Sequence, residues 1–362
     1  MKKVGIFTIY IANYGAVLQT YALQKYLRET YPDLDVQVVD FYTHEPYAIF
    51  KKASDNPIKN ILRQSTKLLH YCELRRRNSR EQHFIKEEFI LSPRYDNVDE
   101  LMANMPQYDI YLTGSDQVFN VKSRYSALFY QTFSVKGGIK AAYAPSFGTS
   151  EFTDDYKSAI RKSISTFSFL SCREDDGASV LSELKGQNIP CVLDPTLLLK
   201  KEQWSKVMSA PMSKDKYLLI YDLNGGQKLV SIAKPIANQN GWKIWCITQH
   251  TDIRYKGVDR LIYDAGPREF IGLFSEAQYV ITDSFHGTAF SIIFEKLFNT
   301  YIAVPRAARR IESLLKECGM SERVIRAGEK VECMNVTGPK SMTDFMQLKE
   351  LSKKFINDIV AA

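Results

Sequence analysis

Short apolar runs alternate with amphipathic runs along most of the chain. The apolar runs are rich in β-branched and aromatic residues, which is typical of buried strands, and the runs between them have the spacing of surface helices. This alternation predicts an α/β protein with parallel sheets covered by helices on both faces. We expect strands at residues 4–9, 36–41, 110–113, 140–144, 168–172, 191–193, 217–221, 243–247, 279–282 and 300–304, and helices at 16–30, 57–90, 154–165, 175–185, 227–239, 267–276, 287–298, 306–318 and 343–360.

A break in this pattern near Asp194-Pro195 predicts two domains, which also suits a length of 362 residues. Proline ends the strand before it, and a new set of strands begins at Tyr217. We expect a first Rossmann-like domain over residues 1–195, with a basic helical insertion at 50–90, and a second over 210–335. A last helix within 340–362 would pack back on the first domain. The two doubly wound domains would face each other across a cleft.

The first fifteen residues, MKKVGIFTIYIANYG, resemble a secretory signal because two lysines precede an apolar run. The run is short for such a signal, is β-branched and aromatic, and ends in the turn Asn13-Tyr14-Gly15. We therefore interpret it as the first buried strand. No stretch approaches 18 consecutive apolar residues, so the sequence predicts no membrane span.

Polar residues follow several expected strands directly, at the edge where open parallel sheets bind ligands. Asn13-Tyr14-Gly15 follows the first strand and leads into a helix that contains Gln19. Gly15 allows the backbone to approach a ligand, and the helix N-terminus offers free N–H groups to an anion or a hydroxyl. A plain turn between strand and helix explains the same residues, so both interpretations stay open.

Three further strands are followed by candidate site residues. Asp116, after the strand 110–113, can cap a helix, bind a sugar hydroxyl or act as a base. Ser146 follows the strand 140–144. Arg173, after the strand 168–172, can hold a carboxylate or a phosphate with its planar guanidinium, or form a surface pair with an acidic neighbour.

The stretch ITDSFHGTAFSIIF at 281–294 places one of only five histidines at a junction between a strand and a helix. Ser284 and His286 precede a helix that starts near Gly287-Thr288, and such a helix start can bind an anion. His286 can donate to that anion or transfer a proton near neutral pH. A histidine is often structural, but its place among several polar clusters that follow strands favours a functional role.

Three arginines, at 306, 309 and 310, begin the next expected helix. Positive charge in a first helical turn opposes the helix dipole, so these arginines need another reason to be there. We interpret Arg306, Arg309 and Arg310 as candidate ligands of an anion shared with the helix that follows His286.

The net charge of +7 is concentrated in one segment. Residues 51–80 contain nine lysines and arginines and two acidic residues, an excess that equals that of the whole chain. The segment is either a solvated basic helix face or a patch for an anionic surface, such as phospholipid or a diphosphate-linked substrate. Few aromatic residues lie near these charges, and no nucleic-acid motif occurs, so we expect no nucleic-acid partner.

The six cysteines predict no metal site. They form no C-x-x-C pair, and none lies at zinc-ligand spacing with a histidine. We interpret them as reduced core cysteines of a cytosolic protein.

An ordered set of these motifs resembles the polysaccharide pyruvyl transferase family and covers about residues 1–330. The resemblance implies two Rossmann-like domains in a GT-B-like arrangement, and transfer of pyruvate from phosphoenolpyruvate to two hydroxyls of a sugar, with formation of a cyclic ketal and release of phosphate. It also implies a cytoplasmic role in the synthesis of bacterial capsule, exopolysaccharide or cell-wall polymer. The motifs are Asn13-Tyr14-Gly15 with Gln19, Gly114-Ser115-Asp116-Gln117, Ser146-Phe147-Gly148, Arg173-Glu174, Leu193-Asp194-Pro195-Thr196 and the stretch from Asp283 to Gly287.

The implied chemistry assigns roles to the candidate residues. His286 would be the general acid that protonates the methylene carbon of the donor, and Asp116 would accept the proton of the attacking hydroxyl. The acceptor would be a sugar or a lipid-linked oligosaccharide, and no cofactor or metal is needed. The donor would be held by Arg173, Ser284, Gly287, Thr288, Arg306 and Arg310, and the acceptor by Asn13, Tyr14, Gly15, Gln19 and Ser146.

One position departs from the family pattern. Many members carry arginine two residues before the histidine, as in R-x-H-G, whereas this chain has Ser284 there. Either an arginine at 306, 309 or 310 replaces it, or the donor differs. Two other functions therefore stay open: a GT-B glycosyltransferase that uses a nucleotide sugar, for which Asn224-Gly225-Gly226 is a faint signal, and a non-catalytic subunit of the same fold that binds glycan.

Overall fold

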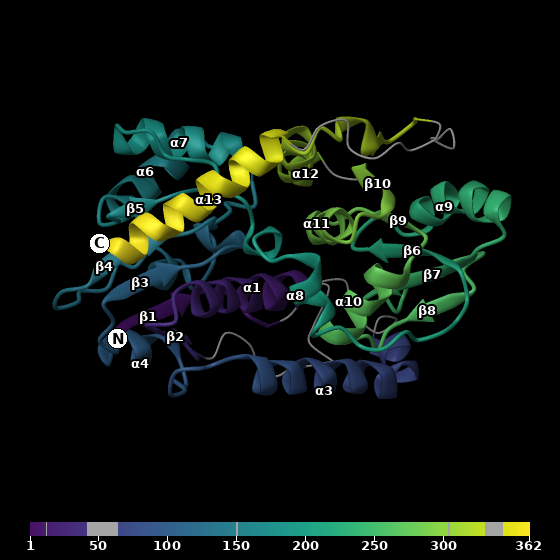
Figure 1. The fold of residues 1–362 in the computed structure, drawn as a ribbon, viewed down its shortest axis with the longest axis horizontal. Coiled ribbons are helices and arrows are strands. Elements are labelled where there is room, and N and C mark those ends of the chain that lie inside the picture. The colour runs from purple at the N-terminus through teal and green to yellow at the C-terminus, as the bar shows by residue number, and fades with distance from the viewer. Residues whose placement is uncertain (12, 42–63, 150, 303–304, 330–342) are drawn as a thin grey trace.

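Two all-parallel sheets form the centres of two α/β domains in the computed structural model, which describes residues 1–11, 13–41, 64–149, 151–302, 305–329 and 343–362. The first sheet has the order β2-β1-β3-β4-β5 and the second β11-β10-β9-β6-β7-β8 (Figure 1). The strands are β1 Lys2–Phe7, β2 Leu34–Val38, β3 Ile110–Thr113, β4 Ile139–Ala142, β5 Phe169–Leu170, β6 Tyr217–Asp222, β7 Lys243–Thr248, β8 Arg260–Ile262, β9 Tyr279–Thr282, β10 Leu297–Ile302 and β11 Val324–Arg326.

Helices connect the strands and cover the sheets. Side-chain caps begin several of them: Asn13 accepts from the N–H of Ala16 at the start of α1, and Ser284 accepts from Gly287 at the start of α11. The helices are α1 Tyr14–Thr30, α3 Tyr71–Glu88, α4 Val98–Ala103, α5 Ser126–Phe129, α6 Asp154–Ile164, α7 Asp175–Lys185, α8 Lys201–Ser205, α9 Gln227–Asn240, α10 Pro267–Glu276, α11 Phe285–Ile293, α12 Pro305–Glu317 and α13 Thr343–Ala361, with 3₁₀ turns η1 Gln117–Phe119, η2 Pro195–Leu197 and η3 Ser321–Arg323.

The predicted fold class is confirmed, two local predictions are wrong, and some short elements were not expected. Residues 191–193 form no strand, because Cys191 makes a single bridge to Cys172 before the chain turns at Pro195 toward the second domain. The expected helix at 287–298 ends at Ile293, and β10 begins already at Leu297. The short edge strands β8 and β11 were not expected, since three residues that include an arginine form no apolar run.

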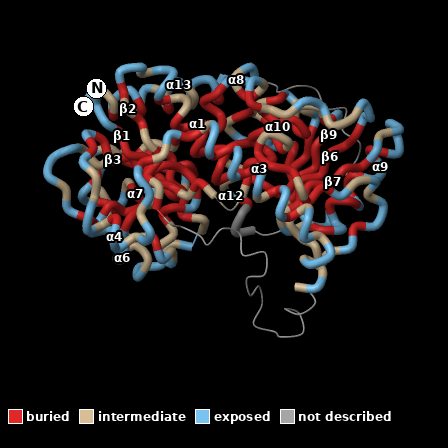
Figure 2. The backbone as a smooth tube through the Cα atoms, turned by 90° about the horizontal axis from the view of Figure 1, so that it is seen from below, coloured by how far each residue is buried: buried red, intermediate tan, exposed pale blue. Residues whose placement is uncertain are grey.

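One continuous core joins the two domains. Tyr14 of α1 stacks on Phe270 of α10 with ring centroids 4.5 Å apart, and Trp204 packs between Tyr21 and Phe290 at 5.5 and 4.9 Å. Figure 2 shows buried backbone in both sheets and across the region between them. Aromatic packing of this kind fixes the elements on the two sides of the cleft relative to each other.

Helix α3 crosses from the first domain to the second, along one side of both (Figure 1). Arg76 donates to Asp264 at 2.8 Å, and Arg80 donates to the backbone carbonyl of Asp264 at 2.7 Å. Two charges of the basic segment 51–80 therefore pair with the second domain. Residues 51–63 of that segment, and most of the expected insertion before α3, lie outside the described residues.

The last helix, α13, runs back over the first domain (Figure 1). The N–H of Leu193 donates to the hydroxyl of Ser352 at 2.9 Å, and the ring of Phe355 contacts the rings of Tyr143 and Phe169. Lys2 donates to the carbonyl of Val360 at 3.0 Å. Across the part of the chain that the structure describes, none of the helices combines the length and the apolar character that crossing a membrane requires.

Candidate active site

A cavity of about 290 Å³ lies where the switch points of the two sheets face each other. In each sheet two neighbouring strands, β1 and β3 in the first and β6 and β9 in the second, send their connections in opposite directions, and ligands bind outside the strand ends at such points. All four of these strand ends contribute side chains. The lining residues are Asn13, Asp116, Gln117, Tyr221, Leu223, Asn224, Gln249, Asp283, Ser284, Phe285, His286, Arg310 and Ile311.

His286 reaches from the second domain to the backbone of the first. It is the second residue of α11, which Ser284 caps, and its side chain is 10% exposed. A Cβ on Gly15 of α1 would lie 2.1 Å from Nδ1 of His286, well inside van der Waals contact. The position of the histidine therefore requires glycine at position 15, whereas the family resemblance implied that this glycine binds the acceptor.

Asp194 and Arg173 form a buried ion pair behind His286. Asp194 Oδ2 accepts from Arg173 Nη1 at 2.7 Å and lies 3.7 Å from Nε2 of His286, which is an electrostatic contact and too long for a hydrogen bond. Burial alone would raise the pKa of Asp194, but its interactions with His286 and Arg173 hold that pKa well below the usual range. The carboxylate is therefore ionised at neutral pH and keeps a negative charge beside the imidazole.

Asp116 lines the cavity in a strained backbone conformation. Its φ of 74° falls in a region that L-residues rarely adopt, and its carbonyl accepts from the N–H of Ser146 at 2.8 Å. Its carboxylate does not cap η1, and Oδ1 lies 3.8 Å from Nη2 of Arg173. A strained polar residue whose carboxylate faces a cavity is a mark of a functional position.

Arg310 of α12 brings a positive charge to the cavity wall. Burial, together with the charge of Arg173, lowers the pKa of Arg310, although a guanidinium stays protonated in proteins. Among the residues that the structure describes, no carboxylate lies within ion-pair distance of it. Arg309 is exposed, and the side chain of Arg306 lies outside the described residues.

Asp283 lies on the same wall and accepts two backbone hydrogen bonds, from Leu223 at 2.8 Å and Asn224 at 2.7 Å. Burial raises its pKa to about 6, since these two N–H groups and that of Gly225 only partly offset the cost of burying the charge. Asp283 thus joins the loop after β6 to the loop after β9, and its raised pKa allows its carboxyl group to titrate near pH 6.

The structure brings five of the predicted site residues to the cavity, and the other described ones do not line it. Asn13, Asp116, Ser284, His286 and Arg310 line the cavity. Gly15 and Gly287 serve close packing instead, because a Cβ on Gly287 would lie 2.3 Å from the hydroxyl oxygen of Thr282.

Five predicted ligands are engaged elsewhere. The hydroxyl of Tyr14 donates to the carbonyl of Ala265, and the amide of Gln19 donates to the hydroxyl of Thr8, just after β1, and to the carbonyl of Ala16 in its own helix. Ser146 donates to Glu174, and Thr288 donates to the carbonyl of Ser284. Arg173, expected to hold the donor, does not line the cavity: its side chain is 1% exposed, bonded to Asp194, and lies over the ring of Phe285 at 4.5 Å.

Sequence reasoning missed one lining residue that carries a readable signal. Gln249 follows β7, so the rule that polar residues after strands mark a site would have found it. Asn224, which follows β6, was noted only as a faint sign of nucleotide-sugar binding. Asp194 was noted as part of a motif but given no role, because its approach to His286 depends on how the domains face each other.

The described residues contain no group of three or more histidine, cysteine or acidic side chains arranged to hold a metal ion. Cys72, Cys172, Cys191, Cys246 and Cys318 are free thiols.

Comparison with solved structures finds the same arrangement of two α/β domains in enzymes of the GT-B fold. A UDP-GlcNAc 2-epimerase from Methanocaldococcus jannaschii, in complex with UDP-GlcNAc and UDP, has a TM-score of 0.50 and 12% identity, and the match covers 97% of this chain and 92% of that one. The corresponding enzyme from Neisseria meningitidis, bound to UDP-GlcNAc, has a TM-score of 0.48, 12% identity and full coverage of both chains. An E. coli heptosyltransferase has a TM-score of 0.39 and 11% identity, with 98% of this chain and 99% of that one covered. At such identities these likenesses show the fold alone.

Comparison with curated protein sequences gives no match. A family model described as polysaccharide pyruvyl transferase matches residues 13–298, which contain every residue that lines the cavity except Arg310 and Ile311. The chain therefore belongs to the polysaccharide pyruvyl transferase family.

Proposed function

We propose that the protein transfers pyruvate from phosphoenolpyruvate to two hydroxyls of a sugar, and that the reaction takes place in the cavity between the two switch points. The observation that carries the proposal is the approach of three groups to one cavity: an arginine with no carboxylate partner among the described residues, a histidine beside a buried carboxylate, and an aspartate. Family membership supports the reaction class, and the positions of these three groups support the roles assigned to them below.

The donor carries a carboxylate and a phosphate, so its site must offer positive charge and N–H donors. Arg310 provides a guanidinium at the cavity wall, and its planar fork matches either anionic group. Arg310 thereby takes the place of the arginine that many family members carry at the position of Ser284. The hydroxyl of Ser284 is engaged in capping α11, since it accepts from Gly287 at 3.3 Å.

Pyruvate transfer begins with protonation of the donor. We assign His286 as the acid that protonates the methylene carbon of phosphoenolpyruvate, which makes C2 electron-poor. One sugar hydroxyl adds to C2, the C2–O bond to phosphate breaks, and the second hydroxyl then adds to C2 and closes the ketal. The two hydroxyls release two protons. These balance the proton given to the methylene carbon and the proton taken up by phosphate. The buried carboxylate of Asp194 lies 3.7 Å from Nε2 of His286 and places a negative charge beside the imidazole.

Asp116 is the base in this scheme. It lines the same cavity as His286 but comes from the first domain, on the loop after β3. A base and an acid from opposite domains suit a reaction in which an acceptor hydroxyl and the donor must be brought together.

The proposed acceptor suggests where in the cell the protein acts. We propose a cytoplasmic protein that acts on a sugar or a lipid-linked oligosaccharide in bacterial polysaccharide synthesis, and that meets the membrane surface through residues 51–80. The pairing of Arg76 and Arg80 with Asp264 leaves fewer of these charges for lipid than the sequence indicated.

A donor screen by thermal shift tests the proposal. Phosphoenolpyruvate is compared with a panel of nucleotide sugars, because a ligand that binds only the folded state raises the melting temperature. We expect stabilisation by phosphoenolpyruvate that is lost in Arg310→Met and kept in Arg309→Met, the exposed neighbour. Stabilisation by a nucleotide sugar alone would instead identify a glycosyltransferase. Lack of response to either class, with retained glycan binding, would identify a non-catalytic subunit.

A further inference from the structure

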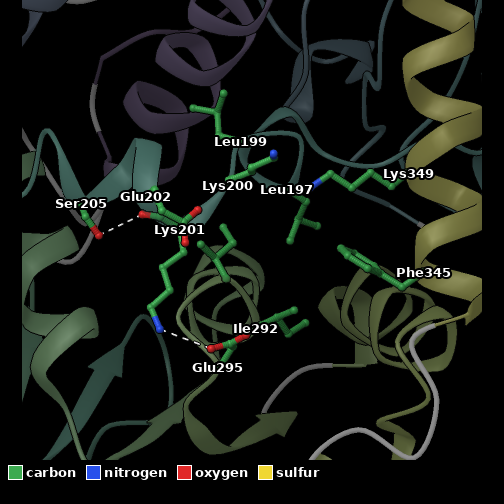
Figure 3. A pocket seen from close by; sticks show the side chains of 11 residues that line it. Leu197, Leu199, Lys200, Lys201, Glu202, Ser205, Ile292, Glu295, Phe345 and Lys349 are labelled. Atoms are coloured by element: carbon green, nitrogen blue, oxygen red, sulfur yellow. Dashed lines mark hydrogen bonds and ion pairs between the residues drawn. The ribbon is translucent and has the colours of Figure 1, made fainter.

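A second cavity, of about 570 Å³, lies apart from the catalytic one (Figure 3). Its walls come from the linker between the domains and α8, from the last turn of α11 with the residues after it, and from the first two turns of α13. No residue lines both cavities. The volume is in the range of small-molecule sites. The lining residues are Leu197, Leu199, Lys200, Lys201, Glu202, Ser205, Ile292, Ile293, Glu295, Phe345 and Lys349.

Two lysines direct their ammonium groups toward each other across this cavity. Figure 3 shows the side chain of Lys200, from the linker, and that of Lys349, from α13, converging above Leu197. Within the described parts of the chain, no carboxylate lies within ion-pair distance of either ammonium group, whereas the neighbouring Lys201 pairs with Glu295 at 3.3 Å. Two converging cations without a counter-ion repel each other, and a bound anion relieves that repulsion.

Lys349 is the more buried of the two lysines. Burial, with the positive charges of Lys353 and Lys200, lowers its pKa to about 8, and Glu350 on its own helix offsets this only in part. The linker side presents Lys200, Lys201 and Glu202, and the α11 side presents Glu295. At pH 7 Lys349 is therefore mostly charged, and a bound dianion would favour that charged form further.

The remaining wall is apolar. Leu197, Leu199 and Phe345 are buried side chains that face the cavity from the linker and α13, and Ile292 and Ile293 face it from α11. A hydrocarbon chain that enters the cavity would lie against this wall, and its methylenes would be removed from water on binding.

From the converging lysines and the apolar wall we infer that this cavity binds a phosphate monoester that carries an apolar chain. The phosphate would lie between Lys200 and Lys349, and the chain would lie against Ile292 and Phe345. The inference does not depend on pyruvyl transfer, because none of the residues involved takes part in the proposed reaction. The same chemistry is offered by a soluble alkyl phosphate and by the head of an anionic lipid.

Calorimetric titration with hexyl phosphate and with inorganic phosphate at pH 7 tests the inference. We expect hexyl phosphate to bind at least about tenfold more tightly than inorganic phosphate, which corresponds to about two buried methylenes. Lys349→Met and Lys200→Met, which keep the apolar stem, should each weaken binding of hexyl phosphate by about tenfold or more. Lys354→Met, an exposed position on the same helix, is the matched control and should change nothing.

Two further experiments identify which cavity binds hexyl phosphate and whether the natural ligand is a soluble phosphate or a lipid. Arg310→Met should leave the binding of hexyl phosphate intact, since the catalytic cavity is not involved. Co-sedimentation with vesicles of phosphatidic acid in phosphatidylcholine that is lost in Lys349→Met would identify a lipid phosphate, and binding of hexyl phosphate without co-sedimentation would identify a soluble one. Three outcomes would each overturn the inference. They are equal affinity for the two phosphates, binding of hexyl phosphate that survives both lysine substitutions, and binding that only Arg310→Met abolishes.

Discussion

Gly15 and His286 come from different domains, and the histidine ring occupies the space that a side chain on Gly15 would fill. A Cβ at Gly15 would lie 2.1 Å from Nδ1, 2.5 Å from Cε1 and 2.8 Å from Cγ of the ring. The position of the proposed acid therefore depends on the backbone of the opposite domain. This closeness also explains why the second residue of α1 is a glycine.

Gly15→Ala should displace the imidazole and lower the transfer rate by about 100-fold, since a shift of about 1 Å at a reacting group can cost that much. Phosphate release from phosphoenolpyruvate measures the rate. In the His286→Ala background the added Gly15→Ala should cost little more, because the ring it would displace is gone. Equal losses in the two backgrounds would show that Gly15 acts by some route other than the histidine.

Asp194→Asn should both slow the reaction and destabilise the fold. The substitution leaves Arg173 buried without its ionised partner, and breaking a buried pair typically costs about 3–5 kcal/mol in the free energy of unfolding. Urea denaturation measures that loss. Removal of both charges, in Asp194→Asn with Arg173→Met, should cost less stability than Asp194→Asn alone, while transfer stays slow. A double variant that is less stable than the single one would contradict the ion-pair account.

Arg310→Met should raise the dissociation constant of phosphoenolpyruvate by at least about tenfold, because a charge-assisted hydrogen bond is lost. Arg309→Met removes the same charge from the neighbouring, exposed position and should change affinity less than twofold. Calorimetric titration of the two variants with phosphoenolpyruvate compares them directly. If both lost affinity equally, the effect would be a general one of positive charge and would not mark a contact in the cavity.

Asp283 should make stability depend on pH in a defined window. Its pKa is raised by burial to about 6 from an ordinary value of 3.8, so the folded state binds the proton more tightly than the unfolded state. The protonated carboxyl therefore contributes to the free energy of unfolding below about pH 4, and this contribution is lost as pH rises through about 6. The total loss is about 3 kcal/mol, because one pKa unit corresponds to about 1.36 kcal/mol. Asp283→Asn cannot titrate there. Unfolding at pH 4 and pH 7 should therefore show the wild type losing stability relative to the variant, and a constant difference would refute the assignment.

The sequence was sufficient for the fold class and for the strand ends that carry the site, because buried strands and the polar residues after them are local signals. Asp116 and His286 were found in this way, and both line the cavity. Roles that depend on the approach of distant segments were not readable. Arg173 appears as a free ligand in the sequence, and only its contact with Asp194, 21 positions later, shows that it supports the site from behind. Gly15 gives no sign of the histidine 271 positions away until both domains are in place.

The central claim is that this cavity moves pyruvate from phosphoenolpyruvate to a sugar. The most direct measurement incubates the protein with phosphoenolpyruvate and a panel of free and lipid-diphosphate-linked sugars that carry neighbouring hydroxyls, and follows released phosphate together with product mass. We predict phosphate release in equal amount to a product heavier by one pyruvate less one water, and loss of both in His286→Ala. Phosphate release and product formation that persist unchanged in His286→Ala, or a product formed only from a nucleotide sugar, would contradict the account.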